Sequence, residues 1–417
     1  MAKMTTALSN IPPRHLFTQL LPGGIALLAA LVFLRPGVLS DDMRPYINAY
    51  PYAILGVGIF LGWYFNRSRV VFAILLLALA DAALLHFGVG ESTGEGVGRT
   101  VFDLLSVLLP LNLAGYAMLD ERGLFTTRGL RRLALIPAQV VPVLLVVLLD
   151  WHGPSAWLEQ PLVNLRLTAW TVLPQTALAI FGVTGILLAG RYILLQSSAI
   201  EAGFLWTLVS TFVALHGIRL GWLPTNFLAT GGLALIAGLV AASYRMAYHD
   251  DLTGLPGRRA MNEALLKLGS RYAMAMVDVD HFKRFNDTYG HDVGDQVLRM
   301  VASRLGGVSG GGKAFRYGGE EFSVIFPNKS TKEAAPHLEA LRRAVAASRF
   351  ILRNPGRPRK KPSTPKPSVA PRKEVSVTVS IGVADRDDRG TDPQQVLKAA
   401  DKALYRAKSA GRNRVMF

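Results

Sequence analysis

The chain has 417 residues, of which 50% are hydrophobic and only 18% are charged, yet its formal net charge is +17. This length favours two or three domains, and soluble domains typically carry about 25% charged residues. The absence of Cys excludes a disulfide framework, thiolate zinc sites and a Cys nucleophile. Residues 1–246 hold 15 Lys and Arg against 11 Asp and Glu, whereas residues 247–417 hold 31 against 18. We therefore expect a membrane region over 1–246 and a basic soluble domain over 247–417.

The first region contains long apolar segments. About 20 apolar residues cross a hydrocarbon core of about 30 Å as a helix. The loops between such segments, taken alternately, hold ten basic residues in one set and five in the other, which predicts cytoplasmic termini. The sequence predicts eight spans, at about 16–34, 47–65, 70–90, 101–119, 133–151, 168–190, 202–218 and 228–245.

Four ionisable residues fall within these predicted spans: Asp81, His86, Asp103 and His216. Ionisable groups are costly in lipid and often functional. One interpretation is that they lie near the interfaces or pair inside the bundle. The other is that they form a pocket that senses a ligand or an ion.

A cluster of polar residues begins where a predicted buried strand ends. The apolar run 272–277 predicts the strand, and Asp278 at its end is delivered to a sheet edge. Asp280, Lys283 and Asn286 follow closely. Carboxylates suit a hard cation, and Asn and Asp side chains can hydrogen-bond a guanine edge. The pattern indicates a metal–phosphate site beside a base-reading pocket.

Two further segments are candidates for phosphate contact. Residues 314–326 form two β-rich arms around Gly318-Gly319, and glycines in a hairpin turn let a phosphate approach the backbone. Asp392-Pro393 predicts a helix start, and Gly411 predicts its end. Lys408 and Arg412 are four residues apart, so we expect them to share one side of that helix end. Each segment alone is also compatible with an ordinary exposed hairpin or a solvated basic helix end.

Taken together, five ordered segments resemble the GGDEF diguanylate cyclase family, in its Gly-Gly-Glu-Glu-Phe form. They are residues 249–259, 278–295, 316–322, 377–384 and 400–415. The resemblance covers about 170 residues and only the second half of the chain. It implies a cytoplasmic α/β domain related to nucleotide cyclases and polymerase palms, with a central antiparallel-rich sheet and flanking helices. We therefore expect an all-α membrane bundle followed by a GGDEF domain.

The resemblance also implies roles for individual residues. Mg²⁺ or Mn²⁺ would be held by Asp278, the carbonyl of Val279, and Glu320, with Glu321 beside them. Glu320 matches the proposed proton acceptor. The resemblance implies that the guanosine is bound by Asn286, His291 and Asp295. It implies that the phosphates are bound by Lys408 and Arg412. Lys283 is a further candidate for phosphate contact because its side chain is basic.

The implied activity is the condensation of two GTP into cyclic di-GMP and two pyrophosphates, in a homodimer anchored in the bacterial inner membrane. Two alternatives remain open. One is a catalytically silent membrane receptor that binds GTP or cyclic di-GMP. The other is a transporter or sensor whose cytoplasmic domain is secondary.

Two departures from the family pattern carry expectations of their own. Many members have an inhibitory Arg-x-x-Asp site where this chain has Ser309–Gly312, so that site is predicted to be absent. An insert at 349–373 holds nine Lys and Arg and six Pro. It is either a solvated tether or a contact for anionic lipid. No aromatic stacking platform accompanies its charge, so nucleic acid is not an expected partner.

Overall fold

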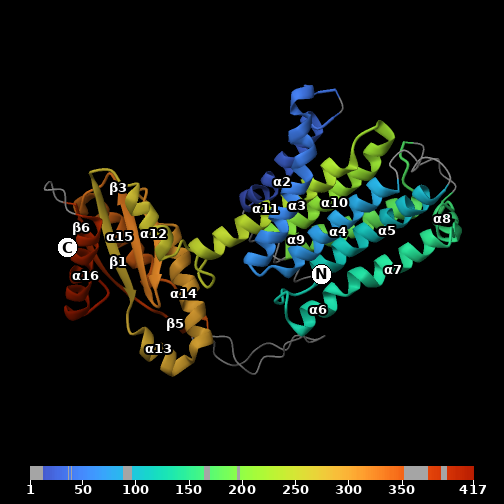
Figure 1. The fold of residues 1–417 in the computed structure, drawn as a ribbon. Helices are drawn as coiled ribbons and strands as arrows, with labels where there is room; N and C mark the ends of the chain where they lie inside the picture. Colours follow the sequence, from blue (N-terminus) through green and yellow to red (C-terminus); the bar gives the residue numbers. More distant parts are fainter. Residues whose placement is uncertain are drawn as a thin grey trace. The chain divides into compact units, whose positions relative to one another are not determined.

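The computed structural model describes residues 13–35, 37–38, 40–87, 96–163, 170–194, 198–351, 374–386 and 392–417 (Figure 1). The chain divides into two compact units, Met1–Tyr244 and Arg245–Phe417. The first is helical, and the second combines helices with a sheet. Most of the basic insert, residues 352–373, lies outside the described residues, and with it the expected contact with anionic lipid.

Each of the eight predicted spans overlaps at least one helix of the first unit. The long helices are α2 (Pro13–Phe33), α3 (Arg44–Tyr64), α4 (Ser68–His86), α5 (Val97–Met118), α7 (Leu135–Leu148), α9 (Gln175–Leu194), α10 (Ala199–Gly217) and α11 (Pro224–Tyr248). The short ones are η1 (Asp41–Met43), α6 (Thr127–Leu133), α8 (Gly153–Leu158) and η3 (Ile218–Leu220).

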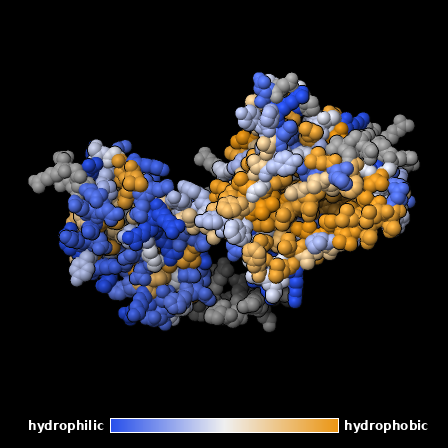
Figure 2. Space-filling model, viewed as in Figure 1, coloured by the Kyte–Doolittle hydropathy of each residue, from blue (hydrophilic) through white to orange (hydrophobic). Residues whose placement is uncertain are grey.

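Within the described residues, six helical segments, rather than the expected eight, are long and apolar enough to cross a membrane. These are α4, α5, α6 with α7, α9, α10 with η3, and α11. The described apolar part of α2 is short, and α3 is less apolar because it carries four tyrosines and two prolines. Figure 2 shows a largely hydrophobic surface over the helical unit, which matches its apolar composition.

Two buried charged residues of the helical unit, Asp103 and Arg69, lie in ion pairs. Asp103 is fully buried and lies 3.2 Å from the guanidinium of Arg99. Arg69 is also buried, and its guanidinium lies 2.9 Å from Glu121 and 3.0 Å from Glu201. Asp103 therefore follows the first interpretation, pairing inside the bundle, which avoids the cost of an uncompensated charge.

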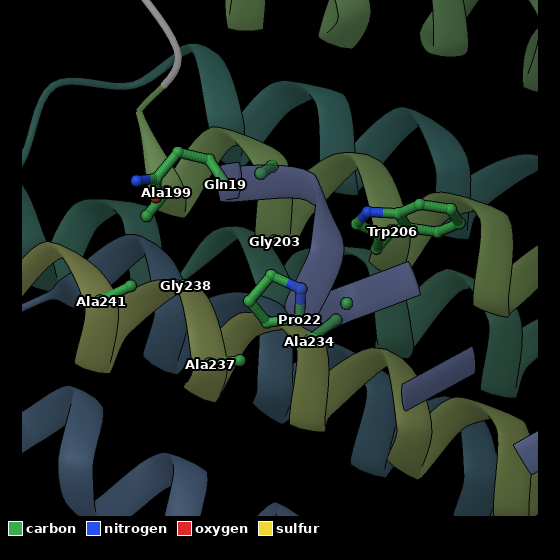
Figure 3. A pocket seen from close by; sticks show the side chains of 11 residues that line it. Gln19, Pro22, Ala199, Gly203, Trp206, Ala234, Ala237, Gly238 and Ala241 are labelled. Atoms are coloured by element: carbon green, nitrogen blue, oxygen red, sulfur yellow. The ribbon is translucent and has the colours of Figure 1, made fainter. Parts of the chain in front are cut away.

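Small residues let α11 pack tightly against α10. A Cβ at Gly203 would lie 3.0 Å from the carbonyl of Ala234, and one at Gly238 would lie 2.5 Å from the carbonyl of Ala199. Figure 3 shows the narrow pocket that these two helices form with α2. The pocket has a volume of about 10 Å³, which leaves space for about one water. Helix α11 is thus held against α10 by backbone-to-backbone contact.

The second unit is built on a mixed five-stranded sheet. The strand order is β2-β3-β1-β6-β7, with every pair antiparallel except β6 and β7. A separate pair is formed by β4, at the start of the basic insert, and β5, directly after its end. The strands are β1 (Tyr272–Val279), β2 (Lys313–Gly318), β3 (Glu321–Pro327), β4 (Phe350–Ile351), β5 (Glu374–Val375), β6 (Val379–Asp385) and β7 (Val415–Met416). The helices are α12 (Arg258–Leu266), α13 (Phe282–Tyr289), α14 (His291–Gly306), α15 (Thr331–Ala346) and α16 (Pro393–Ser409).

Helices cover both faces of this sheet, and the central strand β1 is buried along its whole length. Ala273, Ala275 and Val277 belong to a core with residues of α14 and α15. Met274 and Met276 belong to a second core with residues of α12 and α16. Because side chains alternate along a strand, Asp278 continues the second series and faces the side of α16.

A glycine sets the distance between α16 and the sheet. Gly382 lies in β6, and a Cβ there would collide with backbone atoms of Ala400, Ala403 and Leu404 in α16. We predict that Gly382→Ala pushes α16 outward and lowers the free energy of unfolding by about 1–3 kcal/mol, the usual range for overpacking. Hydrogen exchange in the solubilised full chain should then accelerate in β6 and α16.

Gly269→Ala is the matched control, because nothing lies within 4 Å of a Cβ at that position. This substitution should change the free energy of unfolding by no more than about 0.5 kcal/mol. Exchange in Gly382→Ala as slow as in the unsubstituted chain would contradict the close packing of α16 on β6.

Candidate active site

Asp278 lies at the end of the central strand, between two neighbouring strands. The register places it opposite Glu321 of β3 on one side and Ser380 of β6 on the other. Its side chain is buried, and its Oδ2 lies 2.9 Å from Nζ of Lys408 on α16. Burial raises the pKa of Asp278, and the Lys408 ammonium partly opposes that rise.

The Gly-Gly-Glu-Glu segment forms the turn between β2 and β3. The pairing shifts between Arg316 and Gly318, and Gly319 takes a φ of +44°, a value that favours glycine. The backbone N–H of Val279 donates to the carbonyl of Glu320 at 3.4 Å. The turn is therefore attached to the end of β1, beside Asp278.

Three carboxylates are close enough at this end of the sheet to influence one another. Burial raises the pKa of Glu320 and of Glu321, and the negative charge of Asp278 raises both further. The ammonium of Lys408 acts on both in the opposite direction. The site is thus a group of mutually repelling acids that favours a positive charge among them.

The donor chemistry of this group fits a divalent cation. Mg²⁺ and Mn²⁺ prefer carboxylate and carbonyl oxygens, and Asp278, Val279 and Glu320 offer both kinds. Among the residues that the structure describes, no group of three or more His, Asp or Glu side chains is already arranged to hold a metal ion. Lys408 supplies the positive charge beside Asp278 in this arrangement.

The structure corrects one expectation about the two basic residues near the C-terminus. Lys408 is on α16, but that helix ends at Ser409, so Arg412 does not share a helix face with it. Gly411 and Arg412 both have positive φ, +107° and +63°, which turns the chain away from the helix axis. The charge of Arg412 nevertheless lowers the pKa of Asp278, so both basic residues act on the same carboxylate.

The predicted guanosine residues are on α13 and α14. Asn286 is on α13, and a Cβ on Gly294 of α14 would collide with its Oδ1, so a glycine is needed for this packing. Oδ1 of Asn286 is buried and has no hydrogen-bond partner in the structure. Asp295 follows Gly294 directly and is half-buried. A buried acceptor without a partner suits a ligand that donates hydrogen bonds.

The two remaining predicted residues are exposed. His291 begins α14, and Lys283 is on α13. The structure thus gathers Asp278, Glu320, Glu321 and Lys408 into one group. It packs Asn286 against the helix that carries His291 and Asp295 in another.

Sequence reasoning missed the residues that hold the turn in place. The guanidinium of Arg316 donates to the carbonyl of Gly319 at 2.7 Å and to Oδ1 of Asp250 at 2.6 Å. Burial alone would raise the pKa of Asp250, but hydrogen bonds from Thr253 and Arg316 outweigh it and lower that pKa. Both residues lie in segments that resemble the family, yet only the fold brings them together.

Comparisons with known proteins concern the second unit. The model of the diguanylate cyclase GGDEF domain matches residues 247–414. Diguanylate cyclase VdcA from Vibrio cholerae is 37% identical over 202 residues, covering 46% of this chain and 55% of VdcA. Response regulator PleD from Caulobacter vibrioides is 37% identical over 182 residues, covering 42% of this chain and 37% of PleD.

The coiled coil and GGDEF domain of DgcB from Caulobacter crescentus, solved as a crystal structure in complex with c-di-GMP, is 35% identical in sequence to this chain. The match covers 42% of this chain and 88% of the DgcB chain, with a TM-score of 0.36. The chain spans 55% of VdcA and 37% of PleD, so the similarity is confined to a domain. Residues 247–414 form a GGDEF domain of the diguanylate cyclase family.

Proposed function

We propose that this protein is a membrane-anchored diguanylate cyclase that condenses two GTP into cyclic di-GMP and releases two pyrophosphates. The observation that carries the proposal is the group of Asp278, Glu320, Glu321 and Lys408 at one end of the central sheet. It lies in a domain whose relatives include VdcA, a diguanylate cyclase by name. Residues 1–246 would be the membrane region and residues 247–417 the catalytic domain.

The acidic group would hold Mg²⁺ or Mn²⁺ through Asp278, the Val279 carbonyl and Glu320, with Glu321 alongside. Such an ion supplies charge neutralisation for a triphosphate and a lower pKa for an attacking hydroxyl. The carboxylates contribute by being fixed in place before substrate arrives. Asp278 is on a strand paired on both sides, so little reorganisation is needed.

Glu320 would accept the proton of the attacking 3′-hydroxyl. That oxygen forms a bond to the α-phosphorus of the second GTP, and the bond from this phosphorus to the bridging oxygen breaks. Pyrophosphate leaves with the electron pair, and a second such step closes the ring. A carboxylate is a weak base, so positioning would supply more of the rate than proton transfer.

The basic and amide side chains would bind the rest of the nucleotide. Lys408 and Arg412 would contact the terminal phosphates and then the departing pyrophosphate. Asn286 and Asp295 would bind the guanine edge, with His291 against the guanosine, and Lys283 would reach phosphate from α13. A site that pairs buried polar groups with a base discriminates well against bases that leave them unpaired.

The product has two equivalent linkages, so the active form would be a homodimer. Each subunit would hold one GTP, with the two sites facing each other. On dilution, turnover per chain should therefore fall as dimers dissociate. A turnover per chain that stays constant over the whole dilution range, while the protein is shown to be monomeric, would contradict this arrangement.

We further propose a multi-pass protein of the bacterial inner membrane, with both termini and the catalytic domain in the cytoplasm. The six apolar segments support a membrane location, and α2 and α3 would complete eight crossings. An even number of crossings places both termini on the same side. The loop that contains Arg122 would be cytoplasmic, and the one that contains Arg219 would face outward.

Because the chain has no Cys, single cysteines test this topology directly. An impermeant maleimide added to intact spheroplasts should label Arg219→Cys and spare Arg122→Cys, both of which are exposed positions. Equal labelling after the membrane is permeabilised is the control. The reverse pattern in intact spheroplasts would overturn the orientation.

The activity itself is tested by cyclic di-GMP formation in the detergent-solubilised full chain with GTP and Mg²⁺. Glu320→Gln should lower the rate by about 100-fold or more, the effect of removing one preorganised electrostatic group. Glu374→Gln, an exposed glutamate on β5, is the matched control and should retain the rate. Equal activities of the unsubstituted chain and Glu320→Gln would refute the site, and GTP binding without turnover would favour a silent receptor.

A further inference from the structure

Asp280 is a buried acid beside the proposed site, and the proposed reaction assigns it no role. It follows β1 directly, two residues after Asp278, and is 6% exposed. Its Oδ1 accepts a hydrogen bond from the hydroxyl of Ser380 at 2.6 Å. Its Oδ2 accepts from the hydroxyl of Thr378 at 2.6 Å and from the backbone N–H of Asn413 at 3.1 Å. Both carboxylate oxygens are therefore committed within the protein.

The bond to Asn413 ties β1 to the segment that follows α16. Gly411, Arg412 and Asn413 have φ values of +107°, +63° and +46° in succession. Residues other than glycine rarely adopt this backbone conformation, and it persists only where the surrounding structure holds it. The chain can therefore take this path only while its hydrogen bonds are kept.

Further hydrogen bonds hold this turn and the residue after it. The N–H of Arg412 donates to the carbonyl of Ala407 at 3.0 Å, and the N–H of Ile381 donates to the carbonyl of Arg414 at 2.9 Å. The guanidinium of Arg342 on α15 donates to the side-chain oxygen of Asn413 at 2.6 Å. Asp280 supplies the one charged acceptor among these bonds, and a bond to a charged group is about twice as strong as a neutral one.

The side chain carried by this turn is that of Arg412, one of the two basic residues that act on Asp278. We propose that Asp280 is a positioning residue, whose carboxylate holds the N–H of Asn413 so that Arg412 is directed at the terminal phosphates of GTP. The proposal rests on the proposed function in taking GTP as the ligand and Arg412 as a contact of its terminal phosphates. It assigns Asp280 no contact with metal or substrate.

The test compares two nucleotides that differ at the phosphate end. 3′-Deoxy-GTP lacks the attacking hydroxyl and is not turned over, and GMP lacks the terminal phosphates. In the full chain with Mg²⁺, Asp280→Asn should raise the dissociation constant for 3′-deoxy-GTP about tenfold, as for one lost charge-assisted contact. Binding of GMP should change less than twofold. A general loss of folding would instead weaken the binding of both nucleotides equally.

A double substitution tests whether Asp280 acts through Arg412. Arg412→Ala alone should weaken the binding of 3′-deoxy-GTP in the same way. Adding Asp280→Asn to Arg412→Ala should cause little further loss of affinity. Additive losses would overturn the proposal, because they would show that the two residues act independently. So would unchanged binding in Asp280→Asn.

Two single substitutions separate the bond to Asn413 from the rest of the Asp280 network. Ser380→Ala removes one bond to Asp280 and keeps the bond to Asn413, so 3′-deoxy-GTP should bind within twofold of normal. Asn413→Pro removes the N–H donor, cannot adopt a positive φ and loses the side-chain oxygen that Arg342 contacts. It should therefore weaken binding of 3′-deoxy-GTP at least as much as Asp280→Asn does, with GMP binding within twofold of normal. It keeps the proposal testable if Asp280→Asn fails to fold. A loss in Ser380→Ala equal to that in Asp280→Asn would overturn the proposal. If the chain binds both nucleotides as described but forms no cyclic di-GMP, the proposed function fails and this inference stands.

Discussion

The close approach of α16 to the central sheet is the constraint on which the site depends. Gly382 offers no side chain to the backbone of α16, so the helix lies directly on β6. That contact brings Lys408 within 2.9 Å of the buried carboxylate of Asp278. Without it, three acids would stand together at the sheet end without the ammonium that lies beside Asp278. The site is thus made by packing as much as by its polar residues.

The same end of the sheet is held from three directions. The turn that carries Glu320 is attached to β1 through the N–H of Val279, and Arg316 fixes its glycine carbonyl from the side. On the other side, Asp280 fixes the turn after α16. Rigid placement of charged groups before substrate arrives is what electrostatic catalysis requires. The residues around the site therefore matter through geometry rather than through chemistry.

Much of this arrangement could be predicted from local patterns, and the remainder could not. The apolar run 272–277 and the Asp392-Pro393 helix start depend on neighbouring residues, and both appear as expected. The expectation that Lys408 and Arg412 share a helix face was wrong, because Arg412 itself adopts a positive φ beyond the helix end. Contacts such as Arg316 with Asp250, or Arg69 with Glu201, join residues 66 and 132 positions apart and follow only from the fold. The span count differed because the described apolar part of α2 is short and because α3 mixes apolar residues with tyrosine and proline.

The central claim is that Asp278 and Glu320 together bind the divalent ion that accompanies GTP. Electron paramagnetic resonance of Mn²⁺ titrated into the solubilised chain with 3′-deoxy-GTP measures that binding without turnover. We predict that Asp278→Asn and Glu320→Gln each weaken Mn²⁺ binding about tenfold or more, as the loss of a charged ligand should, while Glu374→Gln leaves it unchanged. Mn²⁺ affinity that is the same in all four proteins would contradict this claim.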